Sequence, residues 1–176
     1  MRVVAGTLGG RRLHAPADRA TRPTADRVRE ALFSILGDVS GLAVLDLFAG
    51  SGALGIEALS RGAARADFVD WSRRSVEAVR RNLDALGVEG GVHRTDALGW
   101  LAAAGGDRRY DLVFCDPPYD SAGRLAQPLA ERLPAVLSED ARIVTESDKR
   151  IPLELPFPLL RERTYGDTRI AVHSGA

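Results

Sequence analysis

Short apolar runs alternate with amphipathic stretches along most of the chain. Five runs have the length and the β-former content of buried strands, and they cover residues 42–48, 65–70, 91–95, 110–115 and 141–146. Between these runs, apolar residues recur at helical spacing over residues 53–61, 76–86, 97–104 and 122–137. Strands that alternate with helices predict parallel βαβ units with right-handed crossovers. We therefore expect an α/β fold built on a doubly wound, mainly parallel sheet.

The last part of the chain breaks this alternation. Two strand-like stretches, residues 159–165 and 168–173, flank Gly166-Asp167, a dipeptide suited to a two-residue hairpin turn. A hairpin makes the last strand antiparallel to its partner. Together with the five earlier runs, it brings the predicted sheet to seven strands with an antiparallel terminal hairpin.

The beginning of the chain has a different character. Residues 2–15 alternate loosely around a glycine-containing turn and predict a short hairpin with basic flanks. A polar, proline-bearing connector follows over residues 16–23. We expect residues 1–23 to form a small N-terminal extension and residues 24–176 to form the main domain.

A helix is predicted directly after the connector. Thr24 is a suitable N-cap residue, and Gly37 ends the run of apolar residues at helical spacing. Because those apolar residues share one face, we expect Arg27, Arg29 and Glu30 on the other faces of this helix.

Composition narrows the class of protein. At 176 residues and 45% hydrophobic content, the chain is long enough to bury the core of one domain. No apolar run is long enough to span a membrane, and the first residues show no signal-peptide pattern. The single cysteine, Cys115, excludes an internal disulfide, and His14, His93 and His173 lack metal-ligand spacing. We expect a cytoplasmic, monomeric protein with no metal and no membrane contact.

The formal net charge is zero, but the charges are unevenly placed. Residues 1–30 contain seven arginines against three acidic residues, a local net charge of +4. Lys149 is the only lysine, so nearly all positive charge is carried by guanidinium groups, whose planar fork suits phosphate. A GC-rich genome could also explain the total arginine count, but it does not explain the bias toward the N-terminus.

A glycine-rich loop follows the first strand of the main domain. Residues 50–55 fit G-x-G-x-x-G between a predicted strand and a predicted helix, and Asp70 ends the next strand. This spacing is typical of Rossmann-like nucleotide-binding folds, in which the glycines permit a tight turn and the acid binds ribose hydroxyls. The loop therefore predicts a nucleotide-containing cofactor.

Asp46 changes which cofactor is expected. It lies four residues before the first glycine, where a carboxylate would repel the pyrophosphate of a dinucleotide. S-adenosylmethionine carries no phosphate but carries a sulfonium and an ammonium group, and Asp46 would attract both. The alternative is that Asp46 only braces the loop through hydrogen bonds to backbone N–H groups.

The stretch Asp116-Pro117-Pro118-Tyr119 follows the apolar run at residues 110–115. Neither proline can donate a backbone hydrogen bond, so a central strand must stop there. A stiff turn then presents Asp116 and Tyr119 at the carboxyl end of the strand, where ligands bind in open α/β sheets. An acid, a rigid backbone carbonyl and an aromatic ring suit a planar amine. The alternative is a proline turn that merely ends a strand.

These motifs carry a family resemblance. Residues 46–52 resemble motif I of class I S-adenosylmethionine-dependent methyltransferases, and residues 116–119 resemble motif IV of those that methylate exocyclic amines of nucleobases. More narrowly, almost the full chain resembles the RsmD-type 16S rRNA (guanine-N2)-methyltransferases. The matching stretches outside the two motifs are residues 2–6, 11–13, 21–30 and 165–166. The resemblance implies S-adenosylmethionine as cofactor and a guanine of 16S rRNA in the small ribosomal subunit as substrate.

The resemblance also implies roles at the cofactor. The loop that would wrap the methionine half and the ribose contributes Asp46, Phe48, Ala49, Gly50, Ser51 and Gly52. Asp70 would bind the ribose hydroxyls, Trp71 would lie against the adenine, and Asp96 with Ala97 would meet the adenine amino group. The alternatives are that Trp71 packs in the core and that Asp96 only caps the next helix.

On the substrate side, the resemblance places Asp116 beside both the cofactor and the target amine. Asp116 and the Pro117 carbonyl would accept the N–H bonds of the amine and turn its lone pair toward the methyl group. Pro118 and Tyr119 would contact the flipped base, with Tyr119 stacking on it. Cys115 lacks a base partner, so we expect a small core residue and no nucleophile.

Recognition of the surrounding RNA is expected to fall to the N-terminal extension. Its candidate phosphate contacts are Arg2, Arg11, Arg12 and Arg22. We expect this extension to fold over the cofactor cleft beside Tyr119, and we expect removal of residues 1–20 to spare the sheet and cofactor binding. The alternative is a solvated basic flap or a structural strap across the sheet.

Other functions remain open from the residues alone. A DNA amine methyltransferase shares both motifs, although the chain has little room for a separate target-recognition region. A protein-glutamine methyltransferase typically has Asn at the position of Asp116. An NAD-dependent oxidoreductase would fit the glycines alone, and a non-catalytic ribosome-assembly factor would fit the basic N-terminus.

Overall fold

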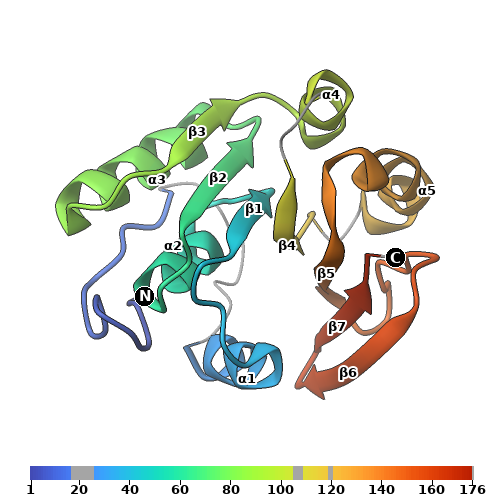
Figure 1. The fold of residues 1–176 in the computed structure, drawn as a ribbon, viewed down its shortest axis with the longest axis horizontal. Helices are drawn as coiled ribbons and strands as arrows, with labels where there is room; N and C mark the ends of the chain where they lie inside the picture. Colours follow the sequence, from blue (N-terminus) through green and yellow to red (C-terminus); the bar gives the residue numbers. More distant parts are fainter. Residues whose placement is uncertain (17–25, 105–108, 119–120, 176) are drawn as a thin grey trace.

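Seven strands form one sheet in the order β3-β2-β1-β4-β5-β7-β6 (Figure 1). The structure is a computed structural model that describes residues 1–16, 26–104, 109–118 and 121–175. The strands are β1 (Ala43–Leu47), β2 (Arg65–Asp70), β3 (Gly91–Arg94), β4 (Tyr110–Cys115), β5 (Leu137–Asp148), β6 (Leu159–Tyr165) and β7 (Thr168–Ser174). Strands β1 to β5 are parallel, and β7 runs antiparallel to both β5 and β6. The predicted α/β fold with a terminal hairpin is confirmed.

Helices cover both faces of the sheet. They are α1 (Asp26–Leu36), α2 (Ala53–Ser60), α3 (Arg73–Leu86), α4 (Ala97–Ala103), α5 (Ala122–Arg132) and the 3₁₀ helix η2 (Leu133–Val136). Apolar residues of α1, α2 and α3 share one core cluster with one face of the strands, and those of α4, α5 and η2 share another with the opposite face. None of the helices within the described ranges is both long and apolar enough to cross a membrane.

One predicted helix divides into two elements. The stretch over residues 122–137 is an α-helix only to Arg132, and the 3₁₀ helix η2 follows with Pro134 in its first turn. Proline lacks the N–H group that would continue the α-helical bonding, which explains the change. β5 then begins at Leu137, four residues earlier than predicted, and pairs with β4 across an irregularity in register.

Helix α1 differs from the prediction in one side chain. Gly37 follows its last residue with a φ of 70°, as a C-terminal glycine is expected to do. The proposed cap Thr24 lies outside the described residues. Arg29, expected on an outer face, is fully buried instead. Its guanidinium donates to the backbone carbonyl of Arg2 and to the carboxylate of Asp26, so it fastens α1 to the start of the chain.

The N-terminal segment, residues 1–16, is part of the main core. In place of a full hairpin it has one isolated antiparallel bridge, between Arg2 and Arg12. Val3 and Leu13, which flank this bridge, are buried in the cluster that contains α1, α2 and α3. This packing argues against the expectation that residues 1–20 can be removed without harm to the sheet.

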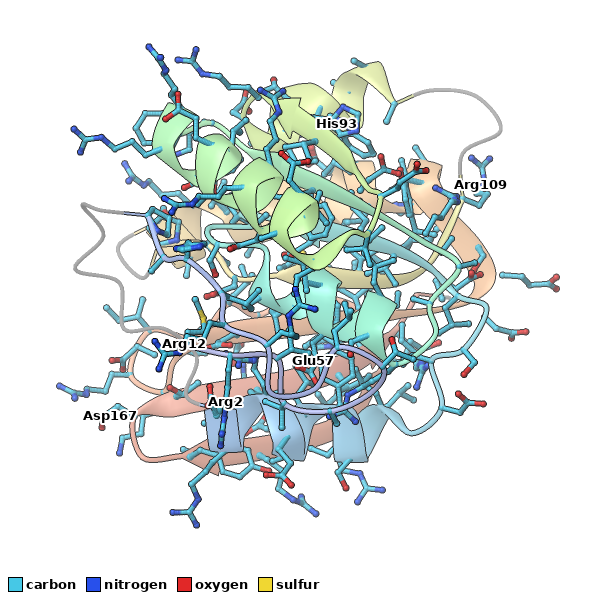
Figure 2. All side chains as sticks on the ribbon, turned by 90° about the vertical axis from the view of Figure 1, so that its left-hand side faces the viewer. Arg2, Arg12, Glu57, His93, Arg109 and Asp167 are labelled. Atoms are coloured by element: carbon cyan, nitrogen blue, oxygen red, sulfur yellow. The ribbon has the colours of Figure 1, made fainter. Side chains whose placement is uncertain are left out.

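Two buried polar side chains hold the N-terminal segment in place. The Glu57 carboxylate on α2 accepts hydrogen bonds from the backbone N–H groups of Val4 and Ala5, at 2.7 and 3.0 Å. Asn82 on α3 exchanges bonds with the backbone of His14, accepting from its N–H at 2.7 Å and donating to its carbonyl at 3.0 Å. Figure 2 shows the segment crossing in front of α2 beside the labelled Glu57.

Candidate active site

Acidic side chains stand at the carboxyl ends of four adjacent parallel strands. Asp70 is the last residue of β2, Asp46 is next to last in β1, and Asp116 follows β4 directly. Asp96 follows β3 by two residues. Because the strand order is β3-β2-β1-β4, these carboxylates are brought to one edge of the sheet in the order Asp96, Asp70, Asp46, Asp116. We call this the carboxyl edge, which is where open α/β sheets bind ligands.

The glycine loop leaves β1 in a conformation that most residues avoid. Phe48 has a φ of 64°. Among the residues that the structure describes, it is the only non-glycine residue in the left-handed region. Gly50 and Gly52 have φ values of 58° and 77°. Left-handed backbone at an aromatic residue costs energy and persists only where its surroundings impose it, commonly at functional sites. Here the Ala49 N–H donates to the Val69 carbonyl at 3.0 Å and holds the loop against β2.

Asp46 braces the glycine loop from below. It is buried, and its Oδ2 accepts the backbone N–H of Gly55 in α2 at 3.0 Å. Burial raises the pKa of Asp46 to about 8, with the nearby charge of Asp70 acting in the same direction and the Gly55 bond opposing it. The bracing bond is therefore present, and the attraction of Asp46 for the cofactor stays a prediction.

Gly55 allows this close approach. A Cβ atom added there would lie 2.4 Å from Cε1 of Phe68 on β2 and 3.2 Å from Oδ2 of Asp46. Real Cβ atoms do not come that close to ring carbons, so the third glycine of the motif lets α2 pack directly on the sheet. This is the helix–strand packing that the fingerprint predicts.

Asp70 joins three parts of the carboxyl edge. Its Oδ2 accepts the Gly50 N–H at 2.9 Å, and its Oδ1 accepts the Ser72 N–H at 2.8 Å. The carboxylate is buried and thus fixes both the glycine loop and the beginning of α3. The structure places Asp70 at the glycine loop through backbone donors, and its predicted bonds to ribose hydroxyls stay a prediction.

Trp71 and Asp96 occupy exposed positions farther along this edge. Trp71 is 67% exposed, so the alternative that it packs in the core is wrong. Asp96 is the N-cap of α4 and accepts the Gly99 N–H at 2.9 Å, so its capping role is present. Ala97, the first residue of α4, is buried.

The Asp-Pro-Pro turn ends β4 as predicted. Asp116 and Pro118 are half-buried, and Pro117 is buried. The Pro118 carbonyl accepts both the N–H and the hydroxyl of Ser121, at 2.9 and 2.7 Å, which closes the turn before α5. Tyr119 lies outside the described residues.

Cys115 is a core residue next to this turn. It is buried in the cluster under α4 and α5. Burial raises the pKa of its thiol, and the charges of Asp46 and Asp116 add to that effect. A thiolate is therefore disfavoured, and the prediction of a small core residue is confirmed.

The described arginines proposed for RNA lie on the N-terminal segment, which also reaches the glycine loop, because the Ser51 hydroxyl donates to the Met1 sulfur at 3.7 Å. Arg2, Arg11 and Arg12 are exposed, and Figure 2 shows the labelled Arg2 and Arg12 on the N-terminal segment. Arg2 pairs with Asp26 at 3.1 Å, and Arg11 donates to the backbone carbonyl of Ala85 in α3 at 2.7 Å. Arg22 lies outside the described residues.

Asn82 is a site residue that the sequence analysis did not identify. Besides its bonds to His14, its Nδ2 donates to the Ser51 carbonyl in the glycine loop at 2.9 Å. It is buried on the apolar face of α3, between Val79 and Leu83. A lone amide within an apolar helical face was the available signal. Asn82 links the N-terminal segment to the glycine loop directly.

The described residues contain no group of three or more His, Cys, Asp or Glu side chains that could hold a metal ion. The histidines have other partners: the His93 ring meets Asp67, and the His173 ring meets the Phe157 carbonyl.

A family model described as "Conserved hypothetical protein 95" matches residues 1–174. The match extends over nearly the whole chain. The chain belongs to this family. Membership confirms the resemblance to RsmD-type proteins, because family relatives carry that name.

Two relatives of known name illustrate the family. "Putative rRNA methyltransferase YlbH" of Bacillus subtilis is 40% identical, with 98% of each chain covered. "Ribosomal RNA small subunit methyltransferase D" of Haemophilus influenzae is 34% identical over 94% of this chain and 89% of that protein. Both alignments span nearly the whole of this chain and most of the relative's chain.

Solved structures share the fold. "Putative methyltransferase yhhF from Escherichia coli" superposes with a TM-score of 0.83 at 32% identity, over 99% of this chain and 97% of that one. At 18% identity, "SMU.776, a putative methyltransferase complexed with SAH" has a TM-score of 0.68 over 85% of this chain and 48% of that one. The second comparison supports the class I methyltransferase fold alone.

Proposed function

We propose that this protein transfers a methyl group from S-adenosylmethionine to the exocyclic N2 amine of a guanine in 16S rRNA. The observation that carries the proposal is the juxtaposition of two motifs at the carboxyl edge. The glycine loop after β1 and the Asp-Pro-Pro turn after β4 belong to neighbouring strands, paired from Val44–Leu112 to Leu47–Cys115. A cofactor held by one motif would therefore meet a base held by the other.

The charges at the carboxyl edge fit this cofactor. The carboxylates of Asp70, Asp96 and Asp116 would repel a pyrophosphate and attract the sulfonium and ammonium groups of S-adenosylmethionine, and Asp46, whose raised pKa favours the protonated form, would contribute less. The glycine loop, residues 48–52, would wrap the methionine half and the ribose. A carboxylate oxygen can accept two hydrogen bonds, so ribose hydroxyls would add to the backbone donors at Asp70.

The adenine end of the cofactor would lie between Trp71 and the start of α4. The exposed indole of Trp71 offers a flat apolar surface for stacking. Asp96 would accept the adenine amino group beside Ala97 while it keeps its capping bond to Gly99.

The substrate amine would be oriented by the turn after β4. Its lone pair is delocalised into the guanine ring, which makes it a poor nucleophile. Asp116 and the Pro117 carbonyl would each accept one N–H bond, which turns the lone pair out of conjugation and stabilises the positive charge that develops on nitrogen. When bound, S-adenosylmethionine would supply an electrophilic methyl group to the amine and leave as S-adenosylhomocysteine, and Asp116 would be placed to accept the proton that the amine loses. Pro118 and Tyr119 would contact the flipped base.

The partner we propose is 16S rRNA within the small ribosomal subunit or an assembly intermediate, approached by a cytoplasmic monomer. Two observations support this partner. The Haemophilus influenzae relative is named a ribosomal RNA small subunit methyltransferase, and the N-terminal extension, residues 1–23, is rich in arginine. Arg2, Arg11, Arg12 and Arg22 remain candidate phosphate contacts.

Methyl transfer from tritiated S-adenosylmethionine onto small subunits that lack the modification tests the proposal. Nucleoside analysis of the product should give N2-methylguanosine in 16S rRNA. Label in DNA, in protein or in another nucleoside would overturn the substrate assignment. Calorimetry against S-adenosylmethionine and NAD is a separate test of the cofactor, and only the first should bind.

A further inference from the structure

The N-terminal segment and α3 together form a strongly basic side of the molecule. Residues 1–16 contain three arginines and no acidic residue, and α3 contains four arginines and two acidic residues. Figure 2 shows the two elements on the same side, with the segment passing beneath α3. Because the whole chain has a net charge of zero, this side is balanced by an acidic excess elsewhere.

One hydrogen bond joins the N-terminal segment to α3. The Arg11 guanidinium reaches α3 and donates to the Ala85 carbonyl at 2.7 Å. Ala85 lies four residues beyond Arg81, and side chains four residues apart on a helix are neighbours. Arg11 and the last turn of α3 therefore lie side by side, although they are distant in sequence.

Four of these guanidinium groups lack a balancing carboxylate. Arg2 pairs with Asp26, and Arg73 pairs with Glu77 at 2.7 Å. Within the described part of the chain, no comparable ion pair involves Arg11, Arg12, Arg80 or Arg81, and all four are exposed. We call these four residues the basic patch.

One contact beside the patch is unfavourable for the free protein. Arg12 stands directly opposite Arg2 in the antiparallel bridge, and like charges directly opposite one another destabilise strand pairing. Glu77 and Asp84 alternate with the arginines of α3, whereas residues 1–16 contain three arginines and no acidic residue. The clustering indicates a polyanionic partner that offsets the repulsion.

We propose that the basic patch binds phosphates of the RNA strand that leads to the target base. This inference rests on the proposed function and adds α3 to the RNA-binding surface. Helix α3 begins directly after Trp71 at the carboxyl edge, and Arg81 lies eight residues beyond Arg73, about 12 Å along the helix axis. RNA whose base enters at the carboxyl edge thus meets the patch at a distance from the reacting atoms. Arginine suits the role because its fork binds phosphate oxygens in pairs.

The test compares two double variants of equal charge. R80A/R81A removes half of the patch and preserves helix propensity, because alanine is the best helix former. R161A/R163A removes two exposed arginines from β6, at the opposite edge of the sheet. Binding to 16S rRNA fragments is measured by filter binding across a salt series. R80A/R81A should weaken binding and lower the salt slope by about 1.4 if both contacts are to single-stranded phosphates. R161A/R163A should match the unsubstituted protein.

Kinetics separate the patch from the catalytic residues. R80A/R81A should raise the KM for RNA while kcat at saturating RNA and the affinity for S-adenosylhomocysteine stay unchanged. R11A/R12A should behave in the same way.

The outcomes distinguish the inference from the proposed function. If the unsubstituted protein neither binds nor methylates rRNA, the proposed function fails. If it does both and R80A/R81A retains its affinity and salt slope, the basic patch is not a phosphate-binding surface. Weaker binding to assembled subunits, with an unchanged slope on protein-free RNA, would also overturn the inference, because it would point to a ribosomal protein as the partner.

Discussion

A substitution at Asp116 should reduce catalysis while it leaves cofactor binding nearly unchanged. Asp116→Ala removes a charged acceptor from the target amine, so we expect methyl transfer to fall below detection, a loss on the order of 3–4 kcal/mol or more in barrier. The affinity for S-adenosylhomocysteine should change little, because the glycine loop and Asp70 carry most of that binding. Single-turnover transfer and calorimetry measure the two quantities. Near-normal turnover in Asp116→Ala would contradict the assigned mechanism.

Asp46 should make stability depend on pH. The pKa of Asp46 is about 8 in the folded protein against an ordinary value of 3.8, so the folded state holds its proton between these values. Its favourable contribution is complete below pH 4 and is lost as the pH rises to 8, by up to about 1.4 kcal/mol per pH unit. Asp46→Asn removes the titration, and its unfolding free energy should improve relative to the parent protein from pH 5 to pH 8.

Urea denaturation at pH 5, 6, 7 and 8 measures this trend. Asp84→Asn, which removes an exposed carboxylate from α3, is the control and should follow the parent protein. If the curves for Asp46→Asn and the parent run parallel, Asp46 is ionised throughout and the buried carboxylate has a cationic partner.

For single residues, the sequence predicted where the acids lie in the fold but not all of their contacts. The strand periodicity placed Asp46, Asp70, Asp96 and Asp116 after four successive strands, and parallel strands share one carboxyl edge. Whether each acid also binds the protein backbone depends on N–H groups of the glycine loop. Those groups reach their positions only when the loop is folded. The bonds of Asn82 join residues 31 and 68 positions away, and no local pattern predicts contacts across such distances.

Among the elements, α3 and the glycine loop should respond together to Asn82→Leu. The substitution keeps a side chain with the same branching and number of heavy atoms but removes the bonds to His14 and Ser51, which leaves buried backbone groups unsatisfied. We expect a loss of roughly 1–3 kcal/mol in unfolding free energy and weaker binding of S-adenosylhomocysteine. Asn82→Asp keeps the acceptor for the His14 N–H, so its unfolding free energy should lie between those of Asn82→Leu and the parent protein. Unchanged cofactor affinity in Asn82→Leu would mean that the loop holds its shape without α3.

The packing of α2 on β2 makes a second prediction at this scale. Gly55→Ala would force a methyl group into the Phe68 ring, so we expect a loss of about 1–3 kcal/mol in unfolding free energy. Gly123→Ala in α5 is the matched control, because a Cβ there meets nothing within 4 Å. It should stabilise by up to about 1 kcal/mol. Equal effects in urea denaturation would show that α2 shifts freely on the sheet.

Helices and strands with a long hydrophobic periodicity could be predicted from the sequence. Segments whose conformation depends on tertiary contacts could not. The buried runs of the central strands and the amphipathic pattern of α3 identified these elements directly. The N-terminal segment was predicted as a separate hairpin because its apolar residues are few. Val3 and Leu13 are buried in a cluster with residues of α1, α2 and α3, which lie farther along the chain, so the role of this segment in the core has no local signature.

For the whole molecule, we expect deletion of residues 1–14 to destabilise the domain. The deletion removes Val3 and Leu13 from the core and leaves Glu57 buried without its backbone donors. The loss should be on the order of 3–5 kcal/mol or more. Thermal unfolding followed by circular dichroism measures it, with R11A/R12A as the control that changes charge and spares the core. An unchanged melting temperature in the deletion variant would restore the view of the segment as a detachable extension.

The bond between Arg11 and Ala85 has a consequence for folding. It spans 74 positions in the chain, and the bonds from the N-terminal segment to α2 span 52 to 55. Closing such long loops costs entropy before the contacts form, so they assemble after the local helices and strands. The basic patch is accordingly absent from the unfolded chain, in which Arg11 and Arg12 are far from Arg80 and Arg81. If the basic patch binds RNA as proposed, high affinity for RNA would be acquired late in folding, and an incompletely folded chain would not compete with the folded protein for that RNA.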